Sequence, residues 1–481
     1  MNLRGRWTAW LAAGCLCHPA LALAHAFGER YDLPVPLGYF VVGAALTVVL
    51  SFVVAAVFMR EASRGAAEGA RTVFLGPLLP LLHAAGRVLG IVLLCAVVVA
   101  GLCGTRNPEM NLAPVLVWII WWVGLSYAVA CFGNFWPALD PWRTLFDGLD
   151  ALARRRGRAA GIALGMAWPA RLGAWPAVFL LLLFVWLEVI YPRSALPSQL
   201  AWLALAWSAL TLAGMVCFGR EAWQRNADVF SIYFATLGRF APVSAGSDGR
   251  SITLRPPGRG LIVAGPDTAA MAAFVIAMLT TVLFDGLLAT QGMVIARHAV
   301  VAWFPVLAND QGYVLGTAGL IGVWLLFGGA FLLACAVTAR LVPSQPTLAV
   351  ASRFAATLVP IAIAYNVAHY FSYLAVHGQL LIPLLSDPLG LGWNLFGTAR
   401  YFPDIAVIDA RTTWHLAIGA IVAGHVISIW LVHRLALRVF GAPRRAVLAT
   451  IPLTVLMVAY TAVSLLILAE PLVQFAGDAP R

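Results

Sequence analysis

The chain of 481 residues contains no lysine, since all 31 of its Lys and Arg positions are arginine. This absence excludes a Walker A phosphate-binding loop, a pyridoxal phosphate Schiff base and any lysine general base. Charge is scarce as well: 11% of the residues are charged and 62% are hydrophobic, whereas an ordinary soluble domain has about 25% charged residues. The composition therefore predicts a polytopic membrane protein, with the lipid bilayer as its first partner.

Cysteine is also rare, with seven residues in the whole chain. Cys15 and Cys17 lie in the first apolar run, and the other five lie within later apolar stretches. This spacing implies neither a disulfide framework nor a CxxC metal knuckle. The net charge of +11 is carried by arginines in a membrane-protein composition. We therefore expect these arginines to anchor loops at the membrane and not to bind nucleic acid.

The amino terminus has the pattern of a secretory signal. Arg4 and Arg6 precede an apolar run, and Ala22-Leu23-Ala24 is typical of a signal peptidase site. Cleavage there removes residues 1–24, so the mature chain begins at His25 and continues to residue 481 as one membrane-embedded domain. Two alternatives are lipoprotein processing at Cys15 and an uncleaved first helix.

Ten further apolar segments approach the length of about 20 residues that crosses a bilayer core. An all-α bundle of about ten spans is therefore predicted. The segments are Leu37 to Met59, Val88 to Gly104, Leu112 to Phe132, Ala174 to Tyr191, Leu200 to Phe218, Ala269 to Leu287, Val314 to Ala336, Phe354 to His377, Trp414 to Arg434 and Val447 to Ala469.

Arginine is distributed unequally between the connecting loops. The loops after the odd-numbered segments hold 22 arginines, and the rest of the mature chain holds seven. The positive-inside rule then places both mature termini in the periplasm of a bacterium, with the protein in the inner membrane. The long connections of residues 286–312 and 378–413 lie on the outer side, where long loops are often functional.

One apolar segment carries a polar stripe. Asn366, His369, Tyr370, Tyr373 and His377 are spaced so that their side chains fall within an arc of about 100° on a helix. Ionisable groups are too costly in lipid, so this stripe is predicted to face the bundle interior or a water-filled cavity.

The next segment supplies a second histidine set, His415, His425 and His433, within an arc of about 80°. If the two helices are antiparallel neighbours, His377 meets the depth of His415, and His369 meets that of His425. Carboxylates lie near the same end of the bundle: Asp285, Asp387, Asp404, Asp409 and Glu188. Histidine and carboxylate together are ligands for zinc or a related divalent metal, which acidifies bound water.

A structural interpretation stands beside the functional one. A histidine in a membrane helix is often hydrogen-bonded across helices, and tyrosines near helix ends are often interfacial anchors. The loop aspartates are equally typical of turns and helix caps, as Ser386-Asp387-Pro388 illustrates.

Several short motifs resemble a known family. They are His25-Ala-Phe-Gly-Glu-Arg-Tyr-Asp-Leu-Pro-Val-Pro, Asn111-Leu-Ala-Pro-Val-Leu-Val-Trp, Asp140-Pro-Trp-Arg-Thr-Leu-Phe, Ser386-Asp-Pro-Leu-Gly-Leu-Gly-Trp-Asn-Leu-Phe-Gly and Gly424-His-Val. Together they resemble the bacterial membrane proteins known as fenitrothion hydrolases. The resemblance implies hydrolysis of an organophosphorus triester by an integral membrane protein.

Three functions follow as hypotheses. In a metal-dependent hydrolase, zinc or copper would be held by His369, His377, His415, His425 and Asp285, with Asp387, Asp404 and Tyr373 as catalytic groups at the periplasmic face. In a transporter, the polar stripe would line the path of a small molecule. In a haem protein, His369 and His425 would be the axial ligands.

Overall fold

The computed structural model describes residues 31–59, 70–246, 248–263, 268–310 and 312–474. The predicted signal peptide, Cys15 and His25 lie outside these residues. The all-α class is confirmed, because nine helices in the described part of the chain are long and apolar enough to cross a membrane. They are α2 (Leu37–Phe58), α3 (Leu78–Cys103), the run from α4 to α5 (Leu112–Phe132), α9 (Pro197–Phe218), α13 (Ala269–Leu288), α15 (Tyr313–Leu341), the run from α16 to α18 (Thr347–Ser386), α19 (Ala410–Phe440) and α20 (Pro443–Leu472).

The fourth predicted segment, Ala174 to Tyr191, forms α8 (Trp175–Val189), which has 15 residues and is shorter than the other spans. The second segment begins earlier than predicted, because α3 starts at Leu78 and continues through His83 and Arg87. Further α-helices, outside both the predicted segments and the nine spans, are α6 (Trp136–Leu139), α7 (Pro141–Arg155), α10 (Arg220–Asn226), α11 (Val229–Phe240), α12 (Arg259–Val263) and α14 (Gln291–Trp303).

Local sequence explains where several helices begin. Asp140, Asp228 and Asp409 cap α7, α11 and α19 by accepting hydrogen bonds from backbone N–H groups of the first turn. Proline occupies the first helical position of α7 and of α9, where its missing N–H has no partner to lose. The helix starts are thus specified by a few residues each.

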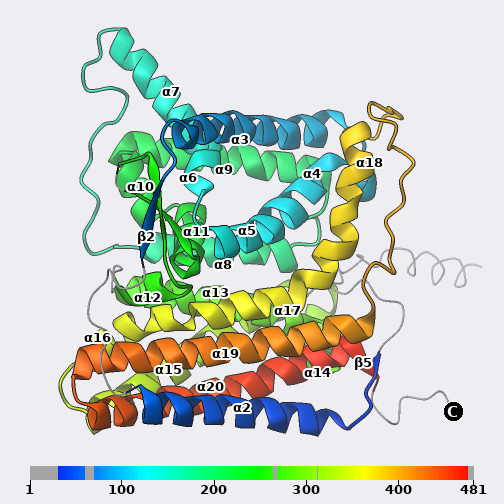
Figure 1. The fold of residues 1–481 in the computed structure, drawn as a ribbon. Coiled ribbons are helices and arrows are strands. Elements are labelled where there is room, and N and C mark those ends of the chain that lie inside the picture. The colour runs from blue at the N-terminus through cyan, green and yellow to red at the C-terminus, as the bar shows by residue number, and fades with distance from the viewer. Residues whose placement is uncertain (1–30, 60–69, 247, 264–267, 311, 475–481) are drawn as a thin grey trace, which may run out of the picture.

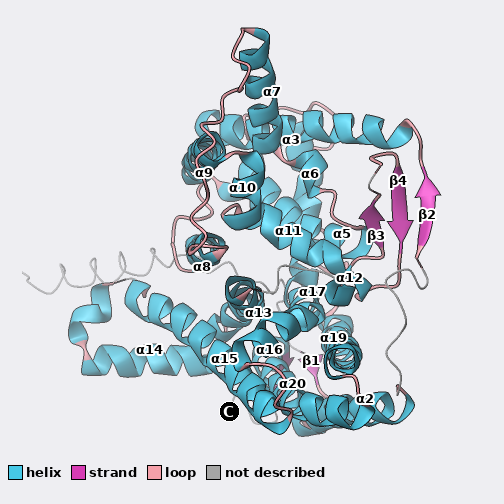
Figure 2. Ribbon diagram, turned by 90° about the vertical axis from the view of Figure 1, so that its left-hand side faces the viewer, coloured by secondary structure: helices cyan, strands magenta, loops and turns pink. Residues whose placement is uncertain are grey.

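The helices form two groups that lie side by side (Figures 1 and 2). One group contains α3, α5 to α7 and α9 to α11, and the other contains α2, α13, α15 to α17, α19 and α20. In Figure 1 the long helices run across the view. We call the end near β2 the β2 end, and the opposite end, which carries α18 (Leu381–Ser386) and the connection of residues 387–409, the α18 end.

A small sheet lies at the β2 end. Strands β3 (Val243–Ala245) and β4 (Ser251–Leu254) form the antiparallel hairpin that Asp248-Gly249 predicts. Strand β2 (Arg71–Phe74) joins the other edge of β4, a pairing that joins segments far apart in the chain. At the opposite end, β1 (Tyr31–Asp32) pairs in parallel with β5 (Val473–Gln474), so the first and last described segments adjoin.

The third span departs from α-helical geometry. Residues Val115–Gly124 form a π-helix between α4 (Leu112–Pro114) and α5 (Leu125–Phe132). π-Helical turns are rare and occur often at functional sites. This one places Trp122 in the interior, where its ring lies 4.6 Å from that of Phe184 and 4.8 Å from that of Tyr233. The π-helix therefore connects α8 and α11 through aromatic packing.

Candidate functional site

A carboxylate, a histidine and a tyrosine meet between α13 and α17. The hydroxyl of Tyr370 donates a hydrogen bond of 2.6 Å to Oδ2 of Asp285. Nε2 of His369 lies 2.9 Å from the same oxygen. The His369 side chain is 1% exposed and that of Asp285 is 19% exposed. Two ionisable groups thus share one hydrogen-bonded contact inside the bundle.

Both helices contribute through their local sequence. His369 and Tyr370 are consecutive residues of α17, and Asp285 lies in the last turn of α13, near the α18 end. Gly286 follows Asp285, and a Cβ atom there would lie 2.8 Å from the Tyr365 hydroxyl. The missing side chain therefore lets α17 approach α13 closely.

Tyr365 extends the site by one turn of α17. Its ring stacks on His369 with a centroid distance of 6.2 Å and an interplanar angle of 17°. Its hydroxyl is buried and has no hydrogen-bond partner among the described residues. A buried donor of this kind is costly unless something hydrogen-bonds to it, so this hydroxyl is available to a water or a substrate.

A second carboxylate belongs to the same region. Glu188, near the end of α8, interacts electrostatically with Asp285 and lies beside the Trp122 indole. Two carboxyl groups thus lie close together in this part of the interior. The site therefore joins α8, α13, α17 and the π-helix.

The predicted polar stripe of α17 does face the interior. Asn366, His369 and Tyr370 are all buried, and Tyr373 and His377 are partly buried. The rings of Tyr373 and His377 lie 4.6 Å apart, which places them together one to two turns beyond His369. The prediction of the stripe is confirmed in its orientation.

The histidines of α19 make other contacts. His415 is exposed, with Nδ1 2.7 Å from the carbonyl of Arg411. His425 is buried, with Nδ1 2.8 Å from the carbonyl of Ile421 and its ring 5.9 Å from that of Tyr460 on α20. His433, also buried, has Nε2 3.1 Å from the carbonyl of Met59.

Helix packing shows why His425 is not level with His369. A Cβ atom on Gly424 would lie 2.4 Å from Cβ of Ala364, so the two helices cross there. Ala364 precedes His369 by five residues, a rise of about 7.5 Å. His425 accordingly lies beside an earlier turn of α17 than the simple pairing of depths predicted.

The predicted loop aspartates organise backbone. Asp387 accepts hydrogen bonds from the N–H groups of Leu391 (2.9 Å) and Gly392 (2.7 Å). Asp404 accepts one from Ala406 (2.8 Å). Asp409 caps α19, and its hydrogen bonds from Thr412 lower the pKa of the carboxyl. These contacts match the alternative interpretation of the aspartates as turn and cap residues.

The family-like motifs also have structural partners. The N–H of Thr105 donates to the carbonyl of Leu389 (2.7 Å), and the Asn111 amide donates to the carbonyl of Ala100 (2.8 Å). Gly390 has a φ of 66°, and a Cβ there would lie 2.4 Å from the carbonyl oxygen of Met110. The turn after α18 is therefore hydrogen-bonded to, and closely packed against, the connection between α3 and α4.

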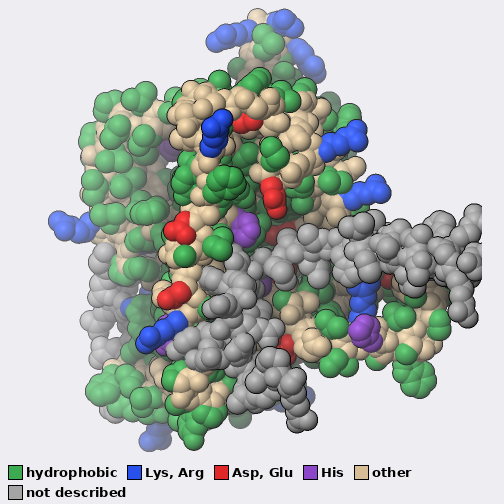
Figure 3. Space-filling view, turned by 90° about the vertical axis from the view of Figure 1, so that its right-hand side faces the viewer, with side chains coloured by type: hydrophobic (Ala, Val, Ile, Leu, Met, Phe, Trp, Pro, Cys, Tyr) green, Lys and Arg blue, Asp and Glu red, His purple; other side chains and the backbone are tan. Residues whose placement is uncertain are grey.

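Within residues 31–59, 70–246, 248–263, 268–310 and 312–474, no group of three His, Cys, Asp or Glu side chains is arranged to hold a metal ion. Of the five residues predicted as metal ligands, Asp285 and His369 are in contact. Nε2 of His369, which the haem hypothesis would use as an axial ligand, lies 2.9 Å from Oδ2 of Asp285. Figure 3 shows the α18 end, where acidic side chains and histidines gather near the middle of the face.

Tyr365 and Trp122 are the members of the site that the sequence did not single out. The position of Tyr365 could have been predicted from the sequence, because Tyr365 precedes His369 by four residues and therefore lies on the same face of the helix. That of Trp122 could not, because its inward position depends on the π-helix.

Comparison with known proteins adds no relative: no protein-family model, no curated protein and no solved structure matches the chain. The nine apolar helices of the described residues identify the chain as a multi-pass membrane protein.

Proposed function

We propose that the protein is a proton-coupled transporter of a small molecule, with Asp285, His369 and Tyr370 as its proton-binding site. The observation that carries the proposal is the 2.9 Å contact between His369 Nε2 and Asp285 Oδ2 within membrane-spanning helices. Ionisable side chains are retained inside a membrane chiefly where they conduct ions, protons or substrates.

The contact supports a simple proton exchange. When the imidazole carries protons on both nitrogens, Nε2–H donates to the Asp285 carboxylate, and the proton can pass to Oδ2 and leave a neutral histidine. The Tyr370 hydroxyl donates to the same oxygen and stabilises its charged form. Glu188 interacts electrostatically with Asp285 and supplies a second acidic group beside the pair.

The position of the site favours access from one side. Asp285 lies one turn from the end of α13 and is 19% exposed, whereas His369 is almost completely buried. The arginine distribution predicts that this α18 end faces the periplasm. Protons would then enter at Asp285 and reach His369 second.

Charge movement on a pH jump tests the proposal without a known substrate. Proteoliposomes of the full chain adsorbed on a solid-supported membrane should give a transient current when the pH changes. Asp285→Asn should abolish the current and His369→Gln should reduce it strongly, while Tyr370→Phe keeps the site and changes its midpoint pH. His83→Ala, on an exposed position of α3, is the matched control. A wild-type current in a correctly inserted Asp285→Asn protein would contradict the proposal.

Metal-dependent hydrolysis of phosphotriesters at the periplasmic face is the second candidate. Its support is the resemblance together with the Asp285–His369 pair, because a carboxylate that orients an imidazole is typical of metal ligands and general bases. Elemental analysis and an absorption spectrum of the purified protein separate the candidates. Stoichiometric zinc or copper that is lost in Asp285→Asn favours the hydrolase, and a Soret band indicates haem. Proton currents without either favour the transporter.

A further inference from the structure

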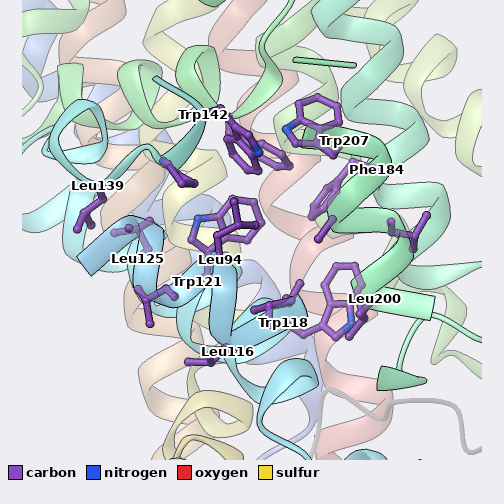
Figure 4. Close-up of a pocket in the computed structure, with 18 of the residues that line it drawn as sticks. Leu94, Leu116, Trp118, Trp121, Leu125, Leu139, Trp142, Phe184, Leu200 and Trp207 are labelled. Carbon is purple, nitrogen blue, oxygen red and sulfur yellow. The ribbon is translucent and has the colours of Figure 1, made fainter. Parts of the chain in front are cut away.

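A cavity of about 620 Å³ lies within the first helix group, apart from the polar site (Figure 4). It is bounded by α3, α8, α9 and the π-helix, and residues around α6 close it toward the β2 end. Trp118, Trp121, Trp142, Phe184 and Trp207 point into it, and the rest of its lining is apolar as well. A site of this volume and chemistry accepts hydrocarbon and not a hydrated ion.

The cavity opens toward lipid. Three leucines of its lining are substantially exposed: Leu93 (36%), Leu183 (51%) and Leu210 (43%). On α9 the lining runs from Leu200 to Leu210, a rise of about 15 Å. That length is half of a hydrocarbon core of about 30 Å, which is the depth of one leaflet.

Three arginines gather beyond the β2 end of the cavity. Arg87 Nη2 lies 3.2 Å from Oδ2 of Asp147, and Arg220 pairs with the other oxygen of the same carboxylate. Burial lowers the pKa of Arg143, and the positive charges of Arg220 and Arg87 act in the same direction, so all three guanidinium groups interact.

Two other carboxylates lie near this cluster. Glu221 lies 3.5 Å from Arg220, but its side chain is 79% exposed to solvent. Asp140 faces Arg143 and is buried, with both of its oxygens engaged in hydrogen bonds. The Nε atoms of Arg143 and Arg220 are buried and have no hydrogen-bond partner among the described residues, so the cluster has donors left for one further anion.

The arginines and the cavity are joined by the chain. Arg143 follows Trp142, which lines the cavity, and Arg87 precedes the lining residue Gly90 by three positions on α3. Gly90 itself touches the backbone of Leu139, because a Cβ there would lie 1.8 Å from that carbonyl oxygen. The guanidinium groups therefore lie about one helical turn beyond the apolar lining.

We propose that the cavity and the arginine cluster together bind one anionic phospholipid, with an acyl chain among the tryptophans and its phosphate against Arg87, Arg143 and Arg220. Basic groups beside apolar clefts between membrane helices recognise acidic lipid headgroups in this way. The charge of the cluster selects an anionic headgroup over a zwitterionic one. This site is separate from the proton site and does not depend on it.

Lipid binding to the full-length protein in detergent tests the headgroup. Native mass spectrometry should show tighter binding of dioleoyl phosphatidylglycerol than of dioleoyl phosphatidylcholine. Arg87→Gln, Arg143→Gln and Arg220→Gln should each weaken phosphatidylglycerol binding about fivefold, as expected for one arginine near a phosphate. Arg154→Gln, at an exposed ion pair of α7, is the matched control and should bind as the wild type does.

A second pair of variants tests the acyl chain. Ala204→Phe fills the cavity, whereas Ala209→Phe adds the same bulk to an exposed position of α9 outside the lining. The first should lower binding of phosphatidylglycerol at least fivefold and the second should not change it.

Two results would overturn the proposal. One is equal binding of the two lipids together with unchanged binding in all three arginine variants. The other is displacement of the lipid by inorganic phosphate alone, with no effect of Ala204→Phe, because that outcome describes a phosphate site and not a lipid site.

Discussion

Helices α13 and α17 differ from α2 and α3 far more in their surroundings than in their composition. The mean hydropathy of the most apolar window is 2.7 in α2, 2.4 in α3, 2.1 in α13 and 1.7 in the span that contains α17. All four values are high enough for a membrane helix. Yet 72% of the α13 window and 67% of the α17 window are buried within the protein, against 17% and 22% for α2 and α3.

This difference in burial explains which helices carry charged side chains. A helix that faces lipid over most of its surface has few partners for a charged group, so α2 carries no Asp, Glu, His or Arg between Leu37 and Phe58, and those of α3, His83 and Arg87, lie in its first half. A helix enclosed by other helices can pair such a group, as α13 and α17 pair Asp285 with His369. Burial, and not hydropathy, distinguishes the central pair.

The largest expected effect is the loss of a central ring. Phe284 on α13 is completely buried, whereas Leu50 on α2 is 63% exposed. Phe284→Ala should destabilise the protein by about 3–5 kcal/mol, because a cavity remains where the ring was packed. Leu50→Ala should cost under about 0.5 kcal/mol, since lipid tails replace the lost contacts. Thermal unfolding in detergent micelles measures both losses of stability. Equal losses would show that burial within the protein does not decide the cost of a substitution in these helices.

A smaller effect is expected at a helix crossing. Gly424→Ala should cost about 1–3 kcal/mol, because the new Cβ meets Ala364 at 2.4 Å. Gly43→Ala on α2 meets nothing within 4 Å and should be neutral or stabilising by up to about 1 kcal/mol. The same unfolding assay applies, and a neutral Gly424→Ala would mean that α17 and α19 can separate without loss.

A pair of buried carboxyl groups, Asp140 and Asp228, lies outside the central helices α13 and α17. Burial, followed by the charge of Asp228, raises the pKa of Asp140 to about 7, and burial raises that of Asp228 to about 6. The folded state therefore holds these protons more tightly than the unfolded state does. The stability that they contribute is complete below the ordinary pKa of 3.8 and is lost as the pH rises through 7.

The melting temperature should accordingly fall between about pH 4 and pH 7, and Asp140→Asn should remove about half of this fall, since two coupled carboxyls share it. Asp150→Asn serves as the control, because hydrogen bonding to Arg154 lowers the pKa of that exposed carboxyl and keeps its titration below this range. An unchanged slope in Asp140→Asn would show that buried carboxyls matter only in the central helices.

The smallest effect is expected at the surface. Arg154 and Asp150 form an exposed ion pair four residues apart on α7, with a distance of 2.8 Å. Arg154→Gln should cost at most about 0.5 kcal/mol, because an exposed pair is screened by water. A denaturant titration of the detergent-solubilised protein checks this, and a loss above 1 kcal/mol would mean that α7 contributes to stability through this pair.

Much of the fold could be predicted because hydropathy is a local property. The spans from Leu37 onward were placed within a few residues in most cases, and Asp248-Gly249 is a local signal for the turn between β3 and β4. The early start of α3 was not predicted, because His83 and Arg87 interrupt the apolar pattern although the helix continues through them.

The candidate site could be predicted only in part. Periodicity identified the face of α17 that carries His369, and Asp285 was selected by its place at the end of a span. The partners of His425 and His415 could not be obtained in this way, because sequence spacing gives depth along one helix and not the offset between two. The aspartates at 387, 404 and 409 show a further limit, since a turn residue and a catalytic residue have the same side chain.

The amino-acid sequence by itself determined that this chain is an all-helical membrane protein with a polar face on one span, because transfer of apolar side chains out of water depends on local composition. Tertiary structure alone decided which polar groups meet. Those meetings depend on close helix approach at Gly286 and Gly424, where a single Cβ would collide with Tyr365 or Ala364. Such contacts arise from packing between segments far apart in the chain, which no local pattern encodes.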